Sequence, residues 1–85
     1  MQVDNISGEQ IASNIRAERH RVHLSQKDVA KQLDITLRTY NSYETDASAV
    51  KVQLLYRLAR IFNCKISAFY LISNSTDCGV VDGDV

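Results

Sequence analysis

Polar side chains that can form paired hydrogen bonds recur in the segment 36–44, whose sequence is TLRTYNSYE. If this segment is helical, each residue turns by about 100° from the one before it, and Arg38, Asn41 and Ser42 then share one arc. Both tyrosines of the segment fall on the opposite arc. The pattern predicts a short helix with a buried aromatic side and an exposed polar side.

The residue types on that arc suit the edges of DNA bases. Arg38 can donate two hydrogen bonds to guanine O6 and N7, and Asn41 can pair with adenine N6 and N7. Ser42 can bond to either kind of base edge, and Leu37, at the border of the arc, can pack against a thymine methyl group. A polar face on a short helix can equally be a solvated surface, and the pattern alone leaves both interpretations open.

Three other residues have types and positions that suit contacts with phosphate. Gln26 stands at the start of the preceding helix and Thr36 at the start of the polar helix, where backbone N–H groups and the helix dipole favour an anion. Lys51 precedes the next apolar helix and can add a positive charge. We therefore expect phosphate contacts from Gln26, Thr36 and Lys51.

Capping residues and apolar spacing predict five helices that would position these side chains. Ser7, Ser25 and Thr36 can each accept a hydrogen bond from the first turn of a following helix. We expect Asp46 to adopt the left-handed conformation that ends the third helix. The fourth helix has apolar residues on so wide an arc that it should be central. We expect the first helix at about 9–21, and the second to begin at residue 25. The third should run from 36 to about 44, the fourth over about 50–63 and the fifth over about 67–72.

Length and composition restrict the class of protein. The chain has 85 residues, no proline and three glycines, and alternating strand patterns are scarce, so we expect one all-α domain. No apolar run is long enough to cross a bilayer, and the start, MQVDNISGEQ, does not resemble a signal peptide. We expect a cytoplasmic protein without a membrane partner.

The formal net charge is zero, although proteins that bind nucleic acid usually have a basic bias. The distribution is uneven, because all ten basic residues lie between Arg16 and Lys65 with only five acids, which gives that segment a net charge of +5. The other five acids lie near the two ends. This arrangement is compatible with nucleic-acid binding, and equally with acids that serve solubility.

Metal and catalytic sites are not expected. Cys64 and Cys78 lie 14 residues apart without a Cys-x-x-Cys motif, and we expect Cys64 to be a core thiol. We expect His20 and His23 to cap or solvate a helix end rather than to bind metal. No catalytic set of nucleophile, base and orienting group is recognisable, so neither an enzyme nor a cofactor is expected.

A series of different short motifs lies between about Ile15 and Tyr70. They are Ile15-Arg16-Ala17-Glu18-Arg19, Leu24-Ser25-Gln26, Val29-Ala30, Ile35-Thr36, Tyr43-Glu44, Leu58-Ala59-Arg60-Ile61-Phe62 and Phe69-Tyr70. Together they resemble the phage repressor and Cro type of helix-turn-helix, also called the xenobiotic-response-element (XRE) family. The resemblance implies a compact five-helix bundle of the lambda-repressor-like DNA-binding type, in which the second and third helices form the helix-turn-helix.

The resemblance also implies roles for individual residues. Leu37, Arg38 and Ser42 match positions that contact bases, while Asn41 and Thr36 match positions that contact flanking phosphates or bases. With the chemistry above, the expected base-reading set is Leu37, Arg38, Asn41 and Ser42.

Two further correspondences concern the ends of the helices. Gln26 matches a glutamine that opens the second helix and contacts the DNA backbone or assists a base contact. Arg19 and Glu44 match a structural salt bridge that ties the first helix to the third. The chain departs from the family pattern at Asp34 and Asp46, where glycine is usual and where aspartate adopts the left-handed conformation less readily.

Two functional hypotheses from different classes follow. The first is a sequence-specific DNA-binding transcriptional regulator, which we expect to be a repressor of phage, plasmid or mobile-element type that binds a palindromic operator. Its helix-turn-helix domain would span 9–72, between an N-terminal arm, 1–8, and an acidic flexible tail, 73–85. The alternative is a protein-interaction module, such as the antitoxin of a toxin–antitoxin pair, whose protein partner would bind through the tail.

A homodimer is expected under the first hypothesis. One recognition helix contacts only about half a site, so a domain of this size gains specificity by pairing about a two-fold axis. Tyr70, Leu71 and Ile72 extend the apolar residue Phe69 into a run of four, which cannot all point inward from one helix. We expect Tyr70, Leu71 and Ile72 to contribute to the dimer interface.

Overall fold

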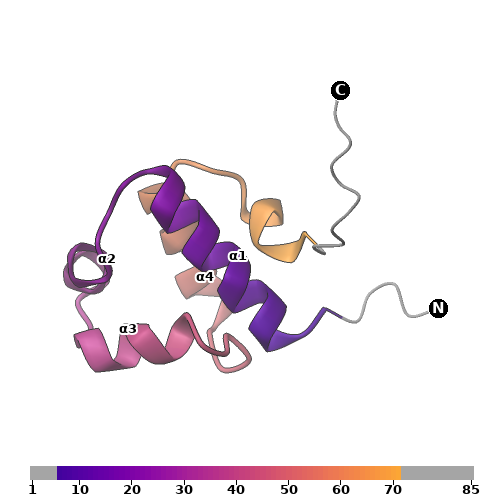
Figure 1. The fold of residues 1–85 in the computed structure, drawn as a ribbon, viewed down its shortest axis with the longest axis horizontal. Helices are drawn as coiled ribbons and strands as arrows, with labels where there is room; N and C mark the ends of the chain where they lie inside the picture. Colours follow the sequence, from indigo (N-terminus) through magenta and orange to yellow (C-terminus); the bar gives the residue numbers. More distant parts are fainter. Residues whose placement is uncertain (1–5, 72–85) are drawn as a thin grey trace.

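A computed structural model of the protein describes residues 6–71, which form four α-helices and one 3-10 helix and contain no strand (Figure 1). The all-α class is therefore confirmed, but the count of five α-helices is wrong. The segment expected to form the fifth is a 3-10 helix of five residues, in which Ala68 N–H donates to the Lys65 carbonyl three residues back. The elements are α1 (Gly8–Arg21), α2 (Gln26–Leu33), α3 (Leu37–Tyr43), α4 (Val52–Ile61) and η1 (Ile66–Tyr70).

The helices surround one core. In Figure 1, α1 crosses the front of the molecule with α4 behind it, α2 and α3 lie together at the left, and η1 lies beside α1 at the right. The largest fully buried side chains come from all five elements and the segment after α4: Ile15, Val29, Leu33, Tyr40, Leu58, Phe62 and Phe69. None of the helices within residues 6–71 has the length and apolar character needed to cross a bilayer.

The three predicted N-caps are confirmed. The hydroxyl oxygens of Ser7, Ser25 and Thr36 accept hydrogen bonds from the backbone N–H groups three residues further along α1, α2 and α3. Each bond satisfies one of the N–H groups that a helix leaves free in its first turn. The start of α3, on which the polar arc depends, is therefore fixed by Thr36.

The ends of the helices differ in part from expectation. Left-handed backbone follows α1 at His23, α2 at Asp34 and α4 at Asn63, with φ of 60°, 61° and 55°. The expectation for Asp46 is wrong, because α3 ends at Glu44 with φ −87° and the chain leaves without a left-handed residue.

One local and one long-range contact hold the loop that follows α3. The Oδ1 atom of Asp46 accepts hydrogen bonds from the backbone N–H and the hydroxyl of Ser48, at 2.9 and 2.6 Å. Ala47 N–H donates to the Gly8 carbonyl at 2.9 Å. A Cβ at Gly8 would collide with Asp46 and Ser48, so glycine is required for this close approach of α1 to the loop.

The central position of α4 is confirmed only for part of its apolar arc. Leu55, Leu58 and Ala59 are buried, but Val52, the first residue of α4, is 53% exposed. The helix is also shorter than expected, by two residues at each end.

Hydrogen bonds connect the end of η1 and Leu71, the last described residue, to α1. The Asn14 side-chain nitrogen donates to the backbone carbonyls of Phe69 and Leu71, both at 2.8 Å. The Phe69 ring also meets Phe62 edge to face, with centroids 6.2 Å apart. Ile72, the tail 73–85 with Cys78, and residues 1–5 of the N-terminal arm lie outside the described residues.

Candidate nucleic-acid interface

The two sides of α3 differ as its sequence indicates. Tyr40 is fully buried, whereas Arg38, Asn41 and Ser42 are exposed and Leu37 is 43% exposed. The buried side joins α3 to the core, so the exposed arc is held in a fixed orientation. Such a helix can enter the major groove of DNA with its outer arc toward the base edges.

The exposed side chains keep most of their hydrogen-bonding capacity. Within residues 6–71, no side-chain hydrogen bond or ion pair involves the Arg38 guanidinium or the Asn41 amide. The Ser42 hydroxyl donates to the Thr39 carbonyl at 2.6 Å, which leaves the lone pairs of its oxygen free. In this conformation, Ser42 suits an amino donor on a base better than an acceptor.

A buried polar network holds the other side of α3. Arg19 Nε lies 2.6 Å from Glu44 Oε2, Arg19 Nη2 lies 3.1 Å from Oε1, and the two side chains are 10% and 2% exposed. The Tyr40 hydroxyl donates to Oε2 and the Gln26 amide nitrogen donates to Oε1 at 3.0 Å. One carboxylate therefore connects α1, the start of α2 and α3.

Ionisation in this network follows from its hydrogen bonds. Burial alone would raise the pKa of Glu44, but hydrogen bonds from Arg19, Tyr40 and Gln26 outweigh burial and hold it below its usual value. Burial, together with the bond to Glu44, raises the pKa of Tyr40 well above its usual value. The hydrogen bond to Glu44 raises the pKa of Arg19, despite its burial. The network therefore contains a carboxylate, a neutral phenol and a guanidinium at neutral pH.

Two members of this arrangement were not identified from sequence. The Tyr40 phenol was assigned to the buried side, but its bond to Glu44 was not foreseen. Arg16 Nη1 donates to the Glu44 backbone carbonyl at 2.6 Å, at the C-terminal end of α3, where a cation is favoured by the helix dipole. The signal was present, because Arg16 and Arg19 are three residues apart and share one face of α1.

The expected phosphate contacts have different surroundings. The Gln26 amide nitrogen points to Glu44, so contact with a phosphate would come from its backbone N–H or its second amide hydrogen. The Thr36 hydroxyl accepts from Thr39 N–H and donates to Thr39 Oγ1 at 2.9 Å. Lys51 is exposed at the N-cap of α4. Of the three, Lys51 has the side chain with no internal hydrogen bond among the described residues.

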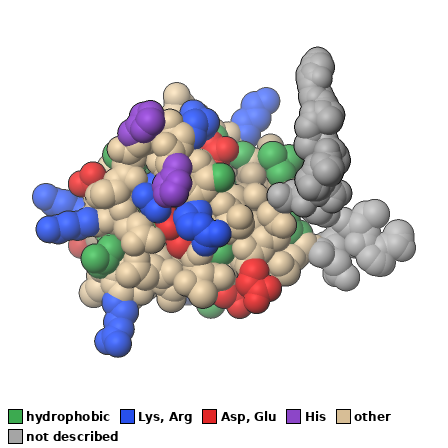
Figure 2. All heavy atoms as spheres, viewed as in Figure 1, with side chains coloured by type: hydrophobic (Ala, Val, Ile, Leu, Met, Phe, Trp, Pro, Cys, Tyr) green, Lys and Arg blue, Asp and Glu red, His purple; other side chains and the backbone are tan. Residues whose placement is uncertain are grey.

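The basic residues divide into two groups. The arginines of α1 bind within the protein: Arg16 and Arg19 contact Glu44, and Arg21 contacts Glu18 at 2.6 Å and the Phe62 carbonyl at 2.7 Å. Figure 2 shows basic side chains projecting on the side of the molecule occupied by α2 and α3. The seven basic residues outside α1, on all parts of the described chain, are exposed. They are Lys27, Lys31, Arg38, Lys51, Arg57, Arg60 and Lys65.

Other candidate residues lie away from α3. Tyr70 and Leu71 are 41% and 63% exposed, so both are accessible to a partner. Cys64 is only partly buried against the core, and burial raises the pKa of its thiol. His20 Nε2 lies 3.1 Å from Arg19 Nη2. No group of three or more His, Cys, Asp and Glu side chains within residues 6–71 could hold a metal ion.

The fold and this surface define a helix-turn-helix domain. A family model described as "Helix-turn-helix" matches residues 15–69, which is more than half of the chain. The chain therefore belongs to the helix-turn-helix family of the XRE, Cro and phage repressor type, and it is a DNA-binding helix-turn-helix regulator. Searches of curated proteins and of solved structures gave no match.

Proposed function

We propose that this protein is a sequence-specific transcriptional repressor of phage, plasmid or mobile-element type, which binds a palindromic operator as a homodimer. Each protomer inserts α3 into a major groove, with Leu37, Arg38, Asn41 and Ser42 toward the base edges. Gln26, Thr36 and Lys51 contact phosphates and fix the register of the helix on the duplex.

One observation supports this proposal most strongly. The outer arc of α3 has exposed Arg38 and Asn41 side chains that have no side-chain partner among residues 6–71, while Tyr40 and Glu44 on its inner side are bound to the rest of the domain. A merely solvated surface does not require a rigid support, whereas base readout requires side chains held in a defined orientation. The buried network therefore favours recognition over simple solvation.

The test is selection of bound duplexes from a random DNA pool by the wild-type protein, Arg38→Ala and Arg60→Ala. Arg60 is exposed on α4, so its variant removes the same charge away from α3. We expect the wild type and Arg60→Ala to enrich the same palindrome. Arg38→Ala should lose its preference at one symmetric pair of positions, with about 1–3 kcal/mol weaker binding.

Two results would contradict the proposal. The first is equal enrichment of one sequence by Arg38→Ala and the wild type, which would exclude Arg38 from readout. The second is an absence of enrichment by the wild type, with weak binding that disappears as salt rises, because that behaviour indicates a generic electrostatic contact. A palindrome with half-sites about one helical turn apart would instead support two copies of α3 in successive grooves.

The alternative function is an antitoxin-like protein-interaction module. Two features motivate it: the tail 73–85, which lies outside the described residues, and the apolar run Tyr70 to Ile72, of which Tyr70 and Leu71 are described and exposed. Co-purification of a protein that is lost on deletion of 73–85 would favour it. The exposed base-reading arc leads us to favour the DNA-binding regulator.

A further inference from the structure

The part of the chain from 47 to 72 has positive charge that it does not balance itself. It contains no aspartate or glutamate, and its basic residues are Lys51, Arg57, Arg60 and Lys65. All four are exposed, and within residues 6–71 none of them forms an ion pair. The tail 73–85 has the opposite composition, with no basic residue and with the acids Asp77, Asp82 and Asp84. The two parts of the chain are therefore complementary in charge.

An exposed row of side chains runs along α4. Val52, Tyr56 and Arg60 are spaced by four residues, so they follow one another on one side of the helix. Val52 is 53% exposed and Tyr56 is 57% exposed, although both could bury apolar surface against a partner. This α4 row is therefore an apolar strip that ends at a positive charge.

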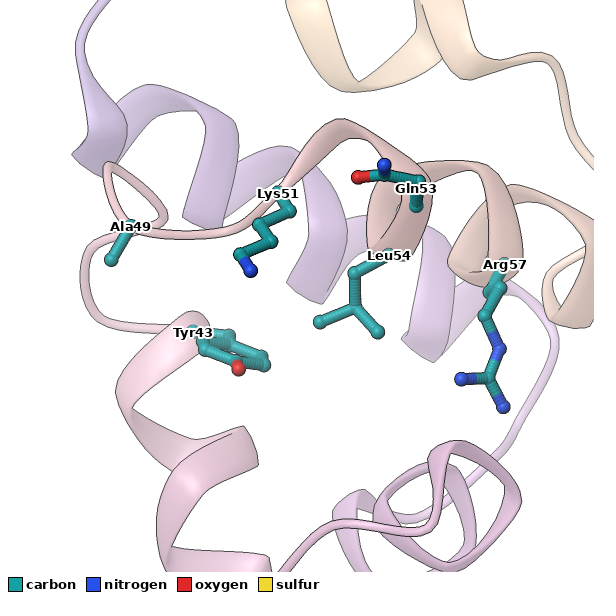
Figure 3. Close-up of a pocket in the computed structure, with 6 residues that line it drawn as sticks. All are labelled: Tyr43, Ala49, Lys51, Gln53, Leu54 and Arg57. Carbon is teal, nitrogen blue, oxygen red and sulfur yellow. The ribbon is translucent and has the colours of Figure 1, made fainter.

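The α4 row does not face α3. Figure 3 shows Leu54 pointing from α4 toward Tyr43 of α3, with Arg57 on the same side of the helix. These three residues line a groove of about 370 Å³ between the two helices. Tyr56 directly precedes Arg57, so its side chain is turned by about 100° from that side. The α4 row therefore lies outside the groove and apart from the base-reading arc.

The tail begins near α4 and is long enough to follow it. The ring of Phe69 meets that of Phe62, the C-cap residue of α4, with centroids 6.2 Å apart. The ten residues of α4 span about 15 Å at 1.5 Å per residue. An extended chain of thirteen residues spans about 43 Å at about 3.3 Å per residue. Because the tail begins four residues after Phe69, it can reach the α4 row of its own chain.

A second copy of the domain fits the α4 row less well. In a symmetric contact centred on α4, each side chain of the row would lie near its equivalent in the other copy. The Arg60 guanidinium groups would then approach each other, and α4 has no acid to offset them. An acidic segment neutralises this charge instead.

We propose that the tail 73–85 docks along the α4 row of its own chain, with its carboxylates toward Arg60 and its apolar pair Val80-Val81 against Tyr56 and Val52. This inference does not depend on the proposed function, because the α4 row is separate from the base-reading arc. A docked tail lowers the positive potential of α4, so fewer phosphates are attracted to a side of the domain that does not read bases.

The test places a nitroxide label on Cys78, which lies within the tail, in the full chain with Cys64→Ala. Amide signals are then measured by NMR. We expect the signals of the α4 row to lose most of their intensity, and to recover it in Asp77→Asn/Asp82→Asn/Asp84→Asn, whose tail is equally long and has no carboxylate. Arg60→Gln should restore part of the intensity. Arg38→Gln, which removes the same charge from α3, should restore none.

A second comparison needs no label and keeps both cysteines. The amide chemical shifts of the wild type and of the triple aspartate variant should differ along the α4 row and agree in α2. Equal signal losses with and without the aspartates, together with unchanged shifts on α4, would overturn the inference. Losses that are strongest at Lys27, Lys31 and Arg38 would also overturn it, because they would assign the tail to α2 and α3.

A mixing experiment distinguishes docking within one chain from docking between two. Isotope-labelled protein without nitroxide is mixed with nitroxide-bearing protein that has no isotope label. We expect the signals of the α4 row to keep their intensity in this mixture. Their loss would show that the tail of a second copy occupies the row, which refutes docking within one chain.

Discussion

Arg19 and Glu44 form a buried ion pair that connects the last turn of α1 to the C-cap residue of α3. Their two hydrogen bonds, of 2.6 and 3.1 Å, have the paired geometry in which a guanidinium matches a carboxylate. Arg19 also donates to the Leu24 carbonyl at 2.9 Å, between α1 and α2. Because α3 has only seven residues, its orientation depends on such contacts more than on its own stability.

We predict that Arg19→Met destabilises the fold by about 3–5 kcal/mol, because it leaves the Glu44 carboxylate buried without its charge partner. In Arg19→Met/Glu44→Met the stranded charge is gone, so the double variant should be less destabilised than the sum of the two single variants. Urea unfolding followed by circular dichroism measures all three. Strict additivity would show that the two side chains do not interact across α1 and α3.

The same carboxylate predicts a loss of stability in acid. The pKa of Glu44 is lowered in the folded protein, so its contribution is present above the unfolded value of about 4.3 and is lost as the pH falls through the folded value. Urea midpoints measured from pH 7 to pH 2 should fall below about pH 4. Hydrogen bonds from Ser48 also lower the pKa of the exposed Asp46. Asp46→Asn is therefore the control, and it should keep most of the acid dependence that Glu44→Gln removes.

Tyr40 predicts a second loss at alkaline pH. Its pKa is raised in the folded protein, so its contribution is present below the unfolded value of about 10 and is lost as the pH rises above it. In Tyr40→Phe this dependence should be weaker, although the variant is less stable at pH 7 because Glu44 loses a donor. The measurement is the urea midpoint at pH 8 to 11 for both proteins. An equally steep decline in Tyr40→Phe would assign the loss to other groups.

Features determined by neighbours in the sequence could be predicted from the residues, whereas the long-range Arg19–Glu44 pair was expected only from the family resemblance and other long-range contacts were not foreseen. Thr36 caps α3 through a backbone group three residues away, so the motif was sufficient. The end of α3 depends on Arg16 from α1 and on the approach of Ala47 to Gly8, which lie far from it in the sequence. Asp46 was consequently given the wrong conformation.

The candidate site shows the same division. The 100° spacing along α3 placed Arg38 on the exposed side and Tyr40 on the buried side, because that property depends only on helix geometry. It did not reveal that the Gln26 amide turns inward to Glu44, nor that Arg57 and Tyr43 line one groove. Both facts depend on how α2 and α4 pack against α3, which periodicity does not determine.

Asp34 provides a prediction at the turn between α2 and α3. Its φ of 61° and ψ of 45° are left-handed, a conformation that glycine adopts without penalty and a residue with a Cβ adopts at about 1–2 kcal/mol. Asp34→Gly should therefore be as stable as the wild type or slightly more stable. Asp34→Ala should be destabilised by about 1 kcal/mol, because alanine lacks the local polar contacts that help aspartate in this region. Thermal unfolding of the three proteins makes the comparison, and equal stability of Asp34→Ala would show that the turn relaxes.

The last prediction concerns the homodimer. Leu71 is 63% exposed and Tyr70 is 41% exposed. Because Asn14 of α1 donates hydrogen bonds to the carbonyls of Phe69 and Leu71, this apolar surface has a defined position on the domain. We predict that Tyr70→Ser/Leu71→Ser weakens self-association at least tenfold in analytical ultracentrifugation, which corresponds to about 1.4 kcal/mol. Tyr56→Ser is the matched control, because Tyr56 is 57% exposed on α4 and should not contribute. A wild-type protein that stays monomeric at high micromolar concentration would contradict the prediction, and a loss of association in Tyr56→Ser alone would move the interface to α4.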